Sequence, residues 1–129
     1  MRLIKNSSGL YEFDVHVRGP KKEKTLKGLI DTGSTDCACT YKLITTLWIR
    51  PISFTKVSTV NVNGAVQNTS KPAWVYSALI KFDNKEDMFN IIRVSSLPQN
   101  ISLLLGMSFL SRCQLNFDGD RYLDINWLT

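Results

Sequence analysis

Lys27-Gly28-Leu29-Ile30-Asp31-Thr32-Gly33-Ser34-Thr35-Asp36 is the stretch that decides how this 129-residue chain folds. An apolar pair, Leu29-Ile30, leads directly into an acid, a hydroxyl and a glycine, as where a buried strand opens into a tight loop. A carboxylate at such a boundary is half shielded from water, and its proton affinity can be tuned there. An Asx-type turn after an ordinary strand gives the same residues, so the rest of the chain has to decide between the two interpretations.

The composition is that of a single globular domain. Hydrophobic residues make up 43% of the chain and charged residues 21%, so the sequence can bury a core and is not of the disordered class. Part of the net charge of +5 comes from Lys21, Lys22, Lys24 and Lys27, which surround a turn at Gly19-Pro20. Neither aromatic-basic stacking nor zinc-finger spacing accompanies these lysines. We therefore favour a solvated turn over a nucleic-acid or phosphate-binding patch.

The cysteines and the single histidine argue against a structural metal site. Three cysteines, Cys37, Cys39 and Cys113, are an odd number, which disfavours a closed disulfide framework. Cys37 and Cys39 face one side of a strand, so a zinc site there would need two more ligands. The single histidine, His16, would bring that set to only three. We expect no metal, no cofactor, and buried free thiols in a reducing compartment.

No segment predicts secretion or membrane insertion. Residues 1–10 hold no apolar core of the signal-peptide kind, and no stretch approaches the roughly 18 apolar residues of a membrane span. We expect a cytoplasmic protein, or a fragment of a longer one, without a membrane partner.

Short strands separated by glycine-marked turns predict a mainly β domain. A helix is expected over Tyr41–Ile49, with Thr40 as its N-cap and Pro51 as its stop. The expected strands are Leu10–Val17, Lys24–Ile30, Cys37–Thr40, Phe54–Val66 with an Asn63-Gly64 hairpin, Ala73–Phe82, Met88–Val94, Leu103–Gly106, Cys113–Phe117 and Tyr122–Ile125. The expected connections are a turn at Asp83–Lys85, a loop or loosely paired strand at Gln67–Pro72, a loop at Ser95–Ser102, a helical turn over Met107–Arg112 and a turn at Asp118-Gly119.

Two motifs in this order resemble those of one enzyme family. Leu29-Ile30-Asp31-Thr32-Gly33-Ser34 is similar to the catalytic loop of aspartic proteases, and Leu104-Leu105-Gly106 is similar to their apolar-apolar-Gly element. Cys113–Phe117 resembles the end of retroviral proteases, and Asn63-Gly64 lies where that family carries its flap. The resemblance implies one retropepsin-like domain over residues 1–129, a closed β-barrel with one or two short helices, closest in character to bacterial and cellular members.

The resemblance also implies an aspartic endopeptidase. In that chemistry two carboxylates share one proton about a water molecule: one acts as general base, and the other donates to the peptide carbonyl. The chain has a single Asp-Thr-Gly, so two copies in a homodimer would each supply Asp31. Thr32 would brace the two loops, Gly33 would leave its carbonyl open to the substrate, and Ser34 would donate to the outer carboxylate oxygen.

Peptide binding would place the substrate as an extended strand between flap and floor. The weaker candidates for contacting it are Asp36, Ala38, Val62, Asn63, Gly64 and Ile101. For Ala38, Val62 and Ile101, an ordinary place in the core is an equal interpretation.

The chain also departs from the viral pattern. Thr35 stands where viral enzymes usually have an acid, and Asp118–Thr129 extends past the point where viral chains stop. In retroviral enzymes the chain ends pair between subunits. Here a turn at Asp118-Gly119 can fold Tyr122–Ile125 back onto Gln114–Phe117, which satisfies these backbone groups within one chain, so the dimer is expected to be weaker. Two other functions stay open: a catalytically silent dimerisation or peptide-binding domain, and a nucleic-acid-binding barrel that uses the lysine run.

Overall fold

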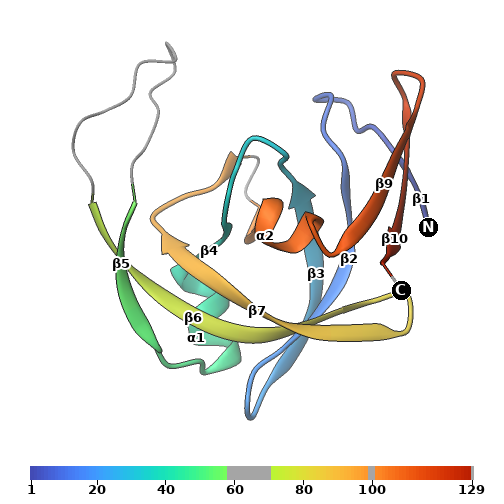
Figure 1. The fold of residues 1–129 in the computed structure, drawn as a ribbon. Coiled ribbons are helices and arrows are strands. Elements are labelled where there is room, and N and C mark those ends of the chain that lie inside the picture. Colours follow the sequence, from blue (N-terminus) through green and yellow to red (C-terminus); the bar gives the residue numbers. More distant parts are fainter. Residues whose placement is uncertain (58–70, 99–100, 129) are drawn as a thin grey trace.

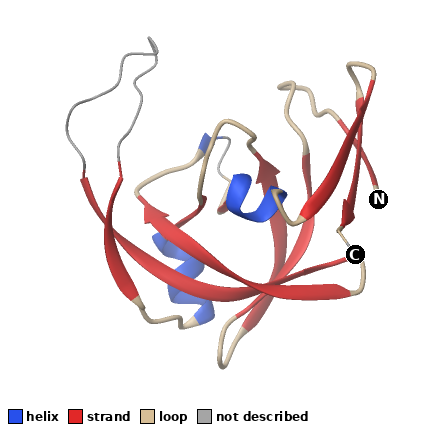
Figure 2. Ribbon diagram, viewed as in Figure 1, coloured by secondary structure: helices blue, strands red, loops and turns tan. Residues whose placement is uncertain are grey.

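Strands predominate in the computed structural model, which describes residues 1–57, 71–98 and 101–128 (Figures 1 and 2). In chain order the elements are β1 (Arg2–Ile4), β2 (Glu12–Arg18), β3 (Glu23–Ile30), β4 (Cys37–Thr40), α1 (Tyr41–Leu47), β5 (Ser53–Val57), β6 (Lys71–Phe82), β7 (Lys85–Val94), β8 (Leu103–Leu105), α2 (Met107–Leu110), β9 (Cys113–Asp118) and β10 (Tyr122–Trp127).

Six strands close into a barrel. They follow one another in the order β2, β3, β8, β4, β7 and β6, and β6 pairs back onto β2 from His16↔Lys81 to Arg18↔Leu79. Strand β5 pairs antiparallel with the first part of β6, from Ser53↔Val75 to Val57↔Lys71. The mainly β class, the closed barrel and the two short helices are therefore confirmed.

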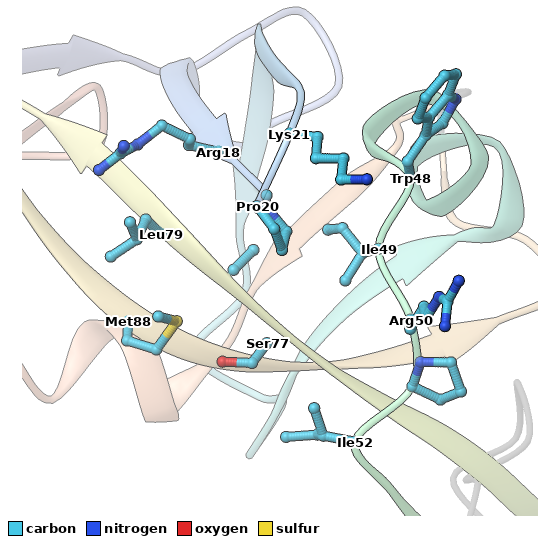
Figure 3. Close-up of a pocket in the computed structure, with 13 residues that line it drawn as sticks. Arg18, Pro20, Lys21, Trp48, Ile49, Arg50, Ile52, Ser77, Leu79 and Met88 are labelled. Carbon is cyan, nitrogen blue, oxygen red and sulfur yellow. The ribbon is translucent and has the colours of Figure 1, made fainter.

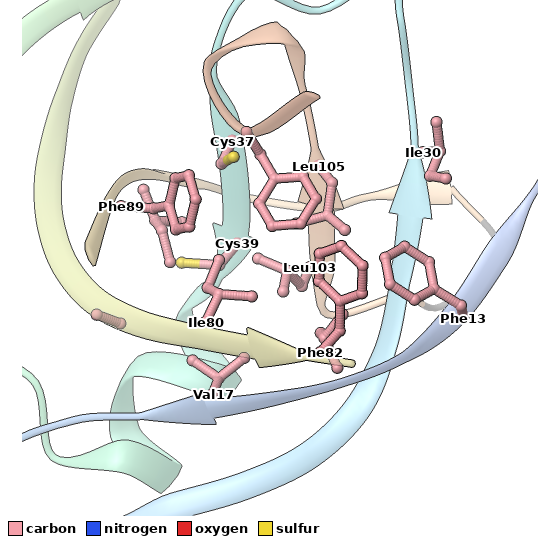
Figure 4. Close-up of a cluster of buried hydrophobic side chains, with 14 of the residues drawn as sticks. Phe13, Val17, Ile30, Cys37, Cys39, Ile80, Phe82, Phe89, Leu103 and Leu105 are labelled. Atoms are coloured by element: carbon pink, nitrogen blue, oxygen red, sulfur yellow. The ribbon is translucent and has the colours of Figure 1, made fainter. Parts of the chain in front are cut away.

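The barrel interior is filled by the apolar face of each strand, as the period-two alternation in β2 predicts. Figure 4 shows these side chains meeting from strands distant in sequence. Phe109 of α2 is fully buried, with its ring centroid 5.8 Å from that of Phe82 and 4.9 Å from that of Phe89. Truncating such a ring to alanine costs about 3–5 kcal/mol. Helix α2 is thus fastened to the barrel by its own buried side chain.

The two ends of the chain form a second sheet, in the order β1-β10-β9. The predicted C-terminal hairpin is confirmed, with Leu123 opposite Phe117 and Ile125 opposite Leu115. Trp127 stacks on Phe82 at 4.5 Å between centroids and donates its indole N–H to the Phe82 carbonyl at 2.8 Å. Strand β1 was not predicted, because three residues with one buried side chain carry no readable periodicity.

Helix α1 begins where it was predicted but ends earlier. Thr40 occupies the N-cap position without a side-chain capping hydrogen bond. The helix stops at Leu47 because Trp48 takes a left-handed conformation with φ of 54°. Glycine is the usual residue in this conformation at a helix end. Because the chain has tryptophan there, the sequence does not indicate that the helix ends before Ile49.

The long hairpin of β6 and β7 also differs at its ends from the prediction. Strand β6 starts at Lys71, inside the stretch expected as a loop or loosely paired strand, and β7 starts at Lys85 instead of Met88. The turn between them is as predicted, with positive φ at both Asp83 and Asn84, as a tight two-residue hairpin requires. The predicted Asn63-Gly64 hairpin lies outside the described residues.

Candidate active site

The loop after β3 is anchored at its start by a parallel strand pair. Ile30 lies opposite Leu105 in the β3–β8 pairing, and the Asp31 backbone N–H donates to the Leu105 carbonyl at 3.1 Å. The Ser34 N–H then donates to the Asp31 carbonyl at 3.3 Å, which turns the chain. Asp31 is therefore held where the buried end of a strand becomes a turn, as the sequence predicts.

The far side of this loop rests on Gly106 and the first residues of α2. The backbone N–H of Met107 donates to the Ser34 carbonyl at 2.7 Å, and that of Ser108 donates to the Thr35 carbonyl at 2.9 Å. A Cβ atom on Gly106 would overlap the Asp36 carbonyl oxygen and come within 2.7 Å of that of Ser34. Only glycine lets the two segments approach this closely.

The two anchors leave the polar part of the loop on the surface. Asp31 is half-buried, and Thr32 and Gly33 are exposed. The Gly33 N–H donates to Oδ1 of Asp31 at 2.9 Å. No hydrogen bond to Oδ2 is found among the described residues, so this oxygen is available to water or to another chain.

Ser34 makes a different contact from the one expected. Its hydroxyl donates to the Asp36 carbonyl at 2.9 Å instead of to the carboxylate of Asp31. A serine side chain two residues before a carbonyl often closes such a local bond. The hydrogen bond to the Asp31 carboxylate comes instead from the backbone N–H of Gly33, and it closes the Asx-type turn that the same residues also predict.

The other predicted site residues are not all placed near Asp31. Asp36 is exposed at the end of the loop, whereas Ala38 is half-buried in β4, opposite Leu104. Ile101 is buried, with 8% of its surface exposed, and Leu104 and Leu105 are also buried. The weaker candidates Val62, Asn63 and Gly64 lie outside the described residues.

The cysteines are free and buried, as predicted. Burial raises the pKa of the Cys39 thiol to about 12 and that of Cys113 to about 11. Burial also raises the pKa of Cys37, whose Sγ lies 3.5 Å from the Ser108 hydroxyl. These thiols are held in the protonated, unreactive form.

His16 and the acids do not assemble a metal site in the part of the chain that the structure describes. No three His, Cys, Asp or Glu side chains gather there as a metal ion requires. His16 lies on the outer face of β2, where its ring contacts the hydroxyl of Thr25 and the carboxylate of Glu23. In the same described residues, neither helix has the length and apolar character needed to cross a membrane.

Comparisons with known proteins point to one family. The sequence model described as retroviral aspartyl protease matches residues 5–118. The fold is similar to the crystal structure of a retropepsin-like aspartic protease from Rickettsia conorii, with a TM-score of 0.68, 21% identity, and coverage of 95% of this chain and 88% of that one. It is also similar to the solution structure of the simian foamy virus (mac) protease, with a TM-score of 0.52, 18% identity, and coverage of 78% and 91%. Among curated proteins, no sequence matches the chain.

Proposed function

Because the chain belongs to the retroviral aspartyl protease family, we propose that it is an aspartic endopeptidase in which Asp31 carries the chemistry. The observation that supports this best is the state of the Asp31 carboxylate. It is half-buried at the end of β3, and its Oδ1 is fixed by the Gly33 N–H. A catalytic carboxylate needs this combination of a fixed orientation and an oxygen open to water.

A complete site takes two copies of the chain, because each contributes one Asp-Thr-Gly. In the homodimer we propose, the two Asp31 side chains share one proton. One accepts a proton from the attacking water, while the other donates to the oxygen of the scissile carbonyl. Thr32, which is exposed, would brace the loop of the partner copy, and the Gly33 carbonyl would accept a hydrogen bond from the substrate backbone.

The substrate is a peptide or protein segment bound in extended form, and the reaction needs no cofactor. For its location we propose the cytoplasm, since three buried free thiols suit a reducing compartment. Asp36, Ala38, Val62, Asn63, Gly64 and Ile101 stay as candidates for contacting the substrate.

The first experiment compares wild type, Asp31→Asn and Asp120→Asn on a peptide library at several pH values. Asp120 lies in the exposed β9–β10 turn, so it is a matched surface carboxylate outside the Asp31 loop. Cleavage should disappear in Asp31→Asn, remain in Asp120→Asn and decline towards alkaline pH, since only the singly protonated pair is active. Folded wild type that cleaves nothing would favour the catalytically silent domain, and equal rates for wild type and Asp31→Asn would overturn the assignment.

A further inference from the structure

A groove of about 750 Å³ lies beside the turn between β2 and β3 (Figure 3). This turn and the loop that follows β3, which holds Asp31, lie at opposite ends of the barrel (Figure 1). The walls of the groove are the turn between β2 and β3 and the segment that follows α1, and its floor comes from β6 and β7. Its lining includes the side chains of Arg18, Lys21, Trp48, Arg50, Ile52 and Met88. A volume of this size is typical of ligand-binding clefts, which span about 300–1,000 Å³.

The groove is preformed by backbone contacts. A Cβ atom on Gly19 would lie 3.0 Å from both the Leu47 carbonyl oxygen and Cγ1 of Ile49, so the turn packs directly against the end of α1. The Ile52 N–H donates to the Val75 carbonyl at 2.8 Å, which ties the opposite wall to β6. A ligand therefore does not have to order these walls, and preorganisation of this kind favours affinity.

Trp48 is displayed at the edge of this groove at a conformational cost. It is 64% exposed, and its φ of 54° is one that a bulky residue rarely adopts. Glycine is the residue that suits this helix end, yet the chain keeps an indole there. Ile52 and Met88 are also exposed, at 58% and 49%, so the apolar surface extends along the groove.

The cations around the groove are not all neutralised. Arg18 pairs with Glu86 at 2.6 Å, and the ammonium group of Lys22 lies over the Trp48 ring at 4.8 Å. Lys21, Lys22 and Arg50 have no ion pair with any acid among the described residues, and the contact with the Trp48 ring leaves the charge of Lys22 in place. The groove thus combines an apolar surface with three nearby positive charges that no acid neutralises.

We propose that this groove binds an extended acidic peptide segment with large apolar side chains at its centre. The apolar residues would lie against Trp48 and Ile52, and flanking carboxylates would pair with Lys21 and Arg50. A nucleic acid is the less suitable occupant, because three unpaired cations neutralise few phosphates. The proposal does not depend on catalysis, since the β2–β3 turn that lines the groove and the loop that follows β3 lie at opposite ends of the barrel (Figure 1).

The test uses the full chain with Asp31→Asn, so that a bound peptide is not cleaved. Fluorescence anisotropy measures the binding of a fluorescein-labelled peptide, Glu-Asp-Leu-Phe-Asp-Glu, and of a version with lysine in place of every acid. We expect the acidic peptide to bind with a Kd of about 10 μM and the basic version to bind at least ~10-fold more weakly. Arg50→Glu and Lys21→Glu should each weaken the acidic peptide about 10-fold. Arg121→Glu, the same charge change in the β9–β10 turn, should leave its Kd within about 2-fold.

Trp48→Gly separates binding from folding. Glycine suits the left-handed conformation, so the variant should melt no lower than the parent protein while losing at least ~10-fold in peptide affinity. Equal affinity in Trp48→Gly and the parent, or equal loss in Arg50→Glu and Arg121→Glu, would overturn the proposal. Tighter binding of a labelled single-stranded RNA than of the peptide, with the same dependence on Arg50, would also overturn it in favour of a nucleic-acid surface.

Discussion

Replacing Gly106, the N-cap residue of α2, with alanine should displace the loop that holds Asp31. The new Cβ would overlap the Asp36 carbonyl oxygen and lie 2.7 Å from that of Ser34. Both of these atoms belong to the backbone, so a change of rotamer cannot remove the clash. The loop has to move away from β8 and α2, and the hydrogen bonds from Met107 and Ser108 to it, at 2.7 and 2.9 Å, lengthen or break.

The expected loss of stability follows from these two effects. Overpacking costs about 1–3 kcal/mol, and each lost backbone hydrogen bond costs roughly 1 kcal/mol. Because moving the loop relieves the clash as it breaks the bonds, the two effects do not add fully. We expect a loss of about 2–4 kcal/mol in the free energy of unfolding, or a decrease in Tm of about 10 °C. A shift of about 1 Å in Asp31 would also decrease peptide cleavage by ~10²-fold.

Gly28→Ala is the matched control for this prediction. Its Cβ would come within 2.8 Å of Cδ1 of Leu105, which is the end of a side chain and can move. We expect a loss of about 1 kcal/mol and cleavage within a few-fold of wild type. Urea denaturation and peptide cleavage, measured on both variants and on wild type, compare the two sites. If Gly106→Ala were as stable and as active as Gly28→Ala, the reasoning that the site requires glycine at position 106 would be wrong.

Three further predictions concern the thiols, the C-terminal strand and the dimer. The native protein should resist thiol reagents at about pH 8. It should lose stability as the pH rises above about 9, because the folded chain keeps the Cys39 thiol protonated, with a pKa of about 12, whereas the unfolded chain releases that proton. Cys39→Ala should flatten this decline, as measured by urea denaturation. Trp127→Ala should decrease stability by about 2–4 kcal/mol, since it removes a ring stacked on Phe82, whereas Leu128→Ala, at an exposed neighbour, should change it by less than about 0.5 kcal/mol. Specific activity should decrease on dilution together with the sedimenting dimer, and constant specific activity in a purely monomeric sample would exclude a two-chain site.

The active-site loop could be predicted because its signal is local. An apolar pair followed by Asp31, a hydroxyl and Gly33 indicates a strand that opens into a turn, and the structure has that arrangement. The reason that Gly106 must be glycine could not be predicted in the same way. It depends on an approach to the Asp36 and Ser34 carbonyls, which lie about 70 residues away and enter no local pattern.

At the groove, too, the sequence predicts the local turn but not which segments pack against it. The lysine run beside Gly19-Pro20 predicts a solvated turn, and Lys21 is indeed exposed. What the pattern does not show is that the end of α1 packs against this turn, so that Trp48 and Arg50 are brought beside it. The left-handed conformation of Trp48 is also outside the reach of propensity, which assigns that position to glycine.

The terminal sheet bears directly on how two copies would assemble. Strands β1 and β10 lie outside residues 5–118, the part that matches the family, yet β10 pairs with both β1 and β9 inside one chain. Leu123 and Ile125 are fully buried there, and Arg2 holds Asp118 and Asp124 by ion pairs. The backbone groups that retroviral chain ends satisfy across a dimer, as the resemblance implies, are therefore satisfied locally. The homodimer we propose has to rest on the exposed Thr32 and Gly33 of each loop and on the outer edge of β9, a smaller set of contacts, so each folded chain should persist when the dimer dissociates.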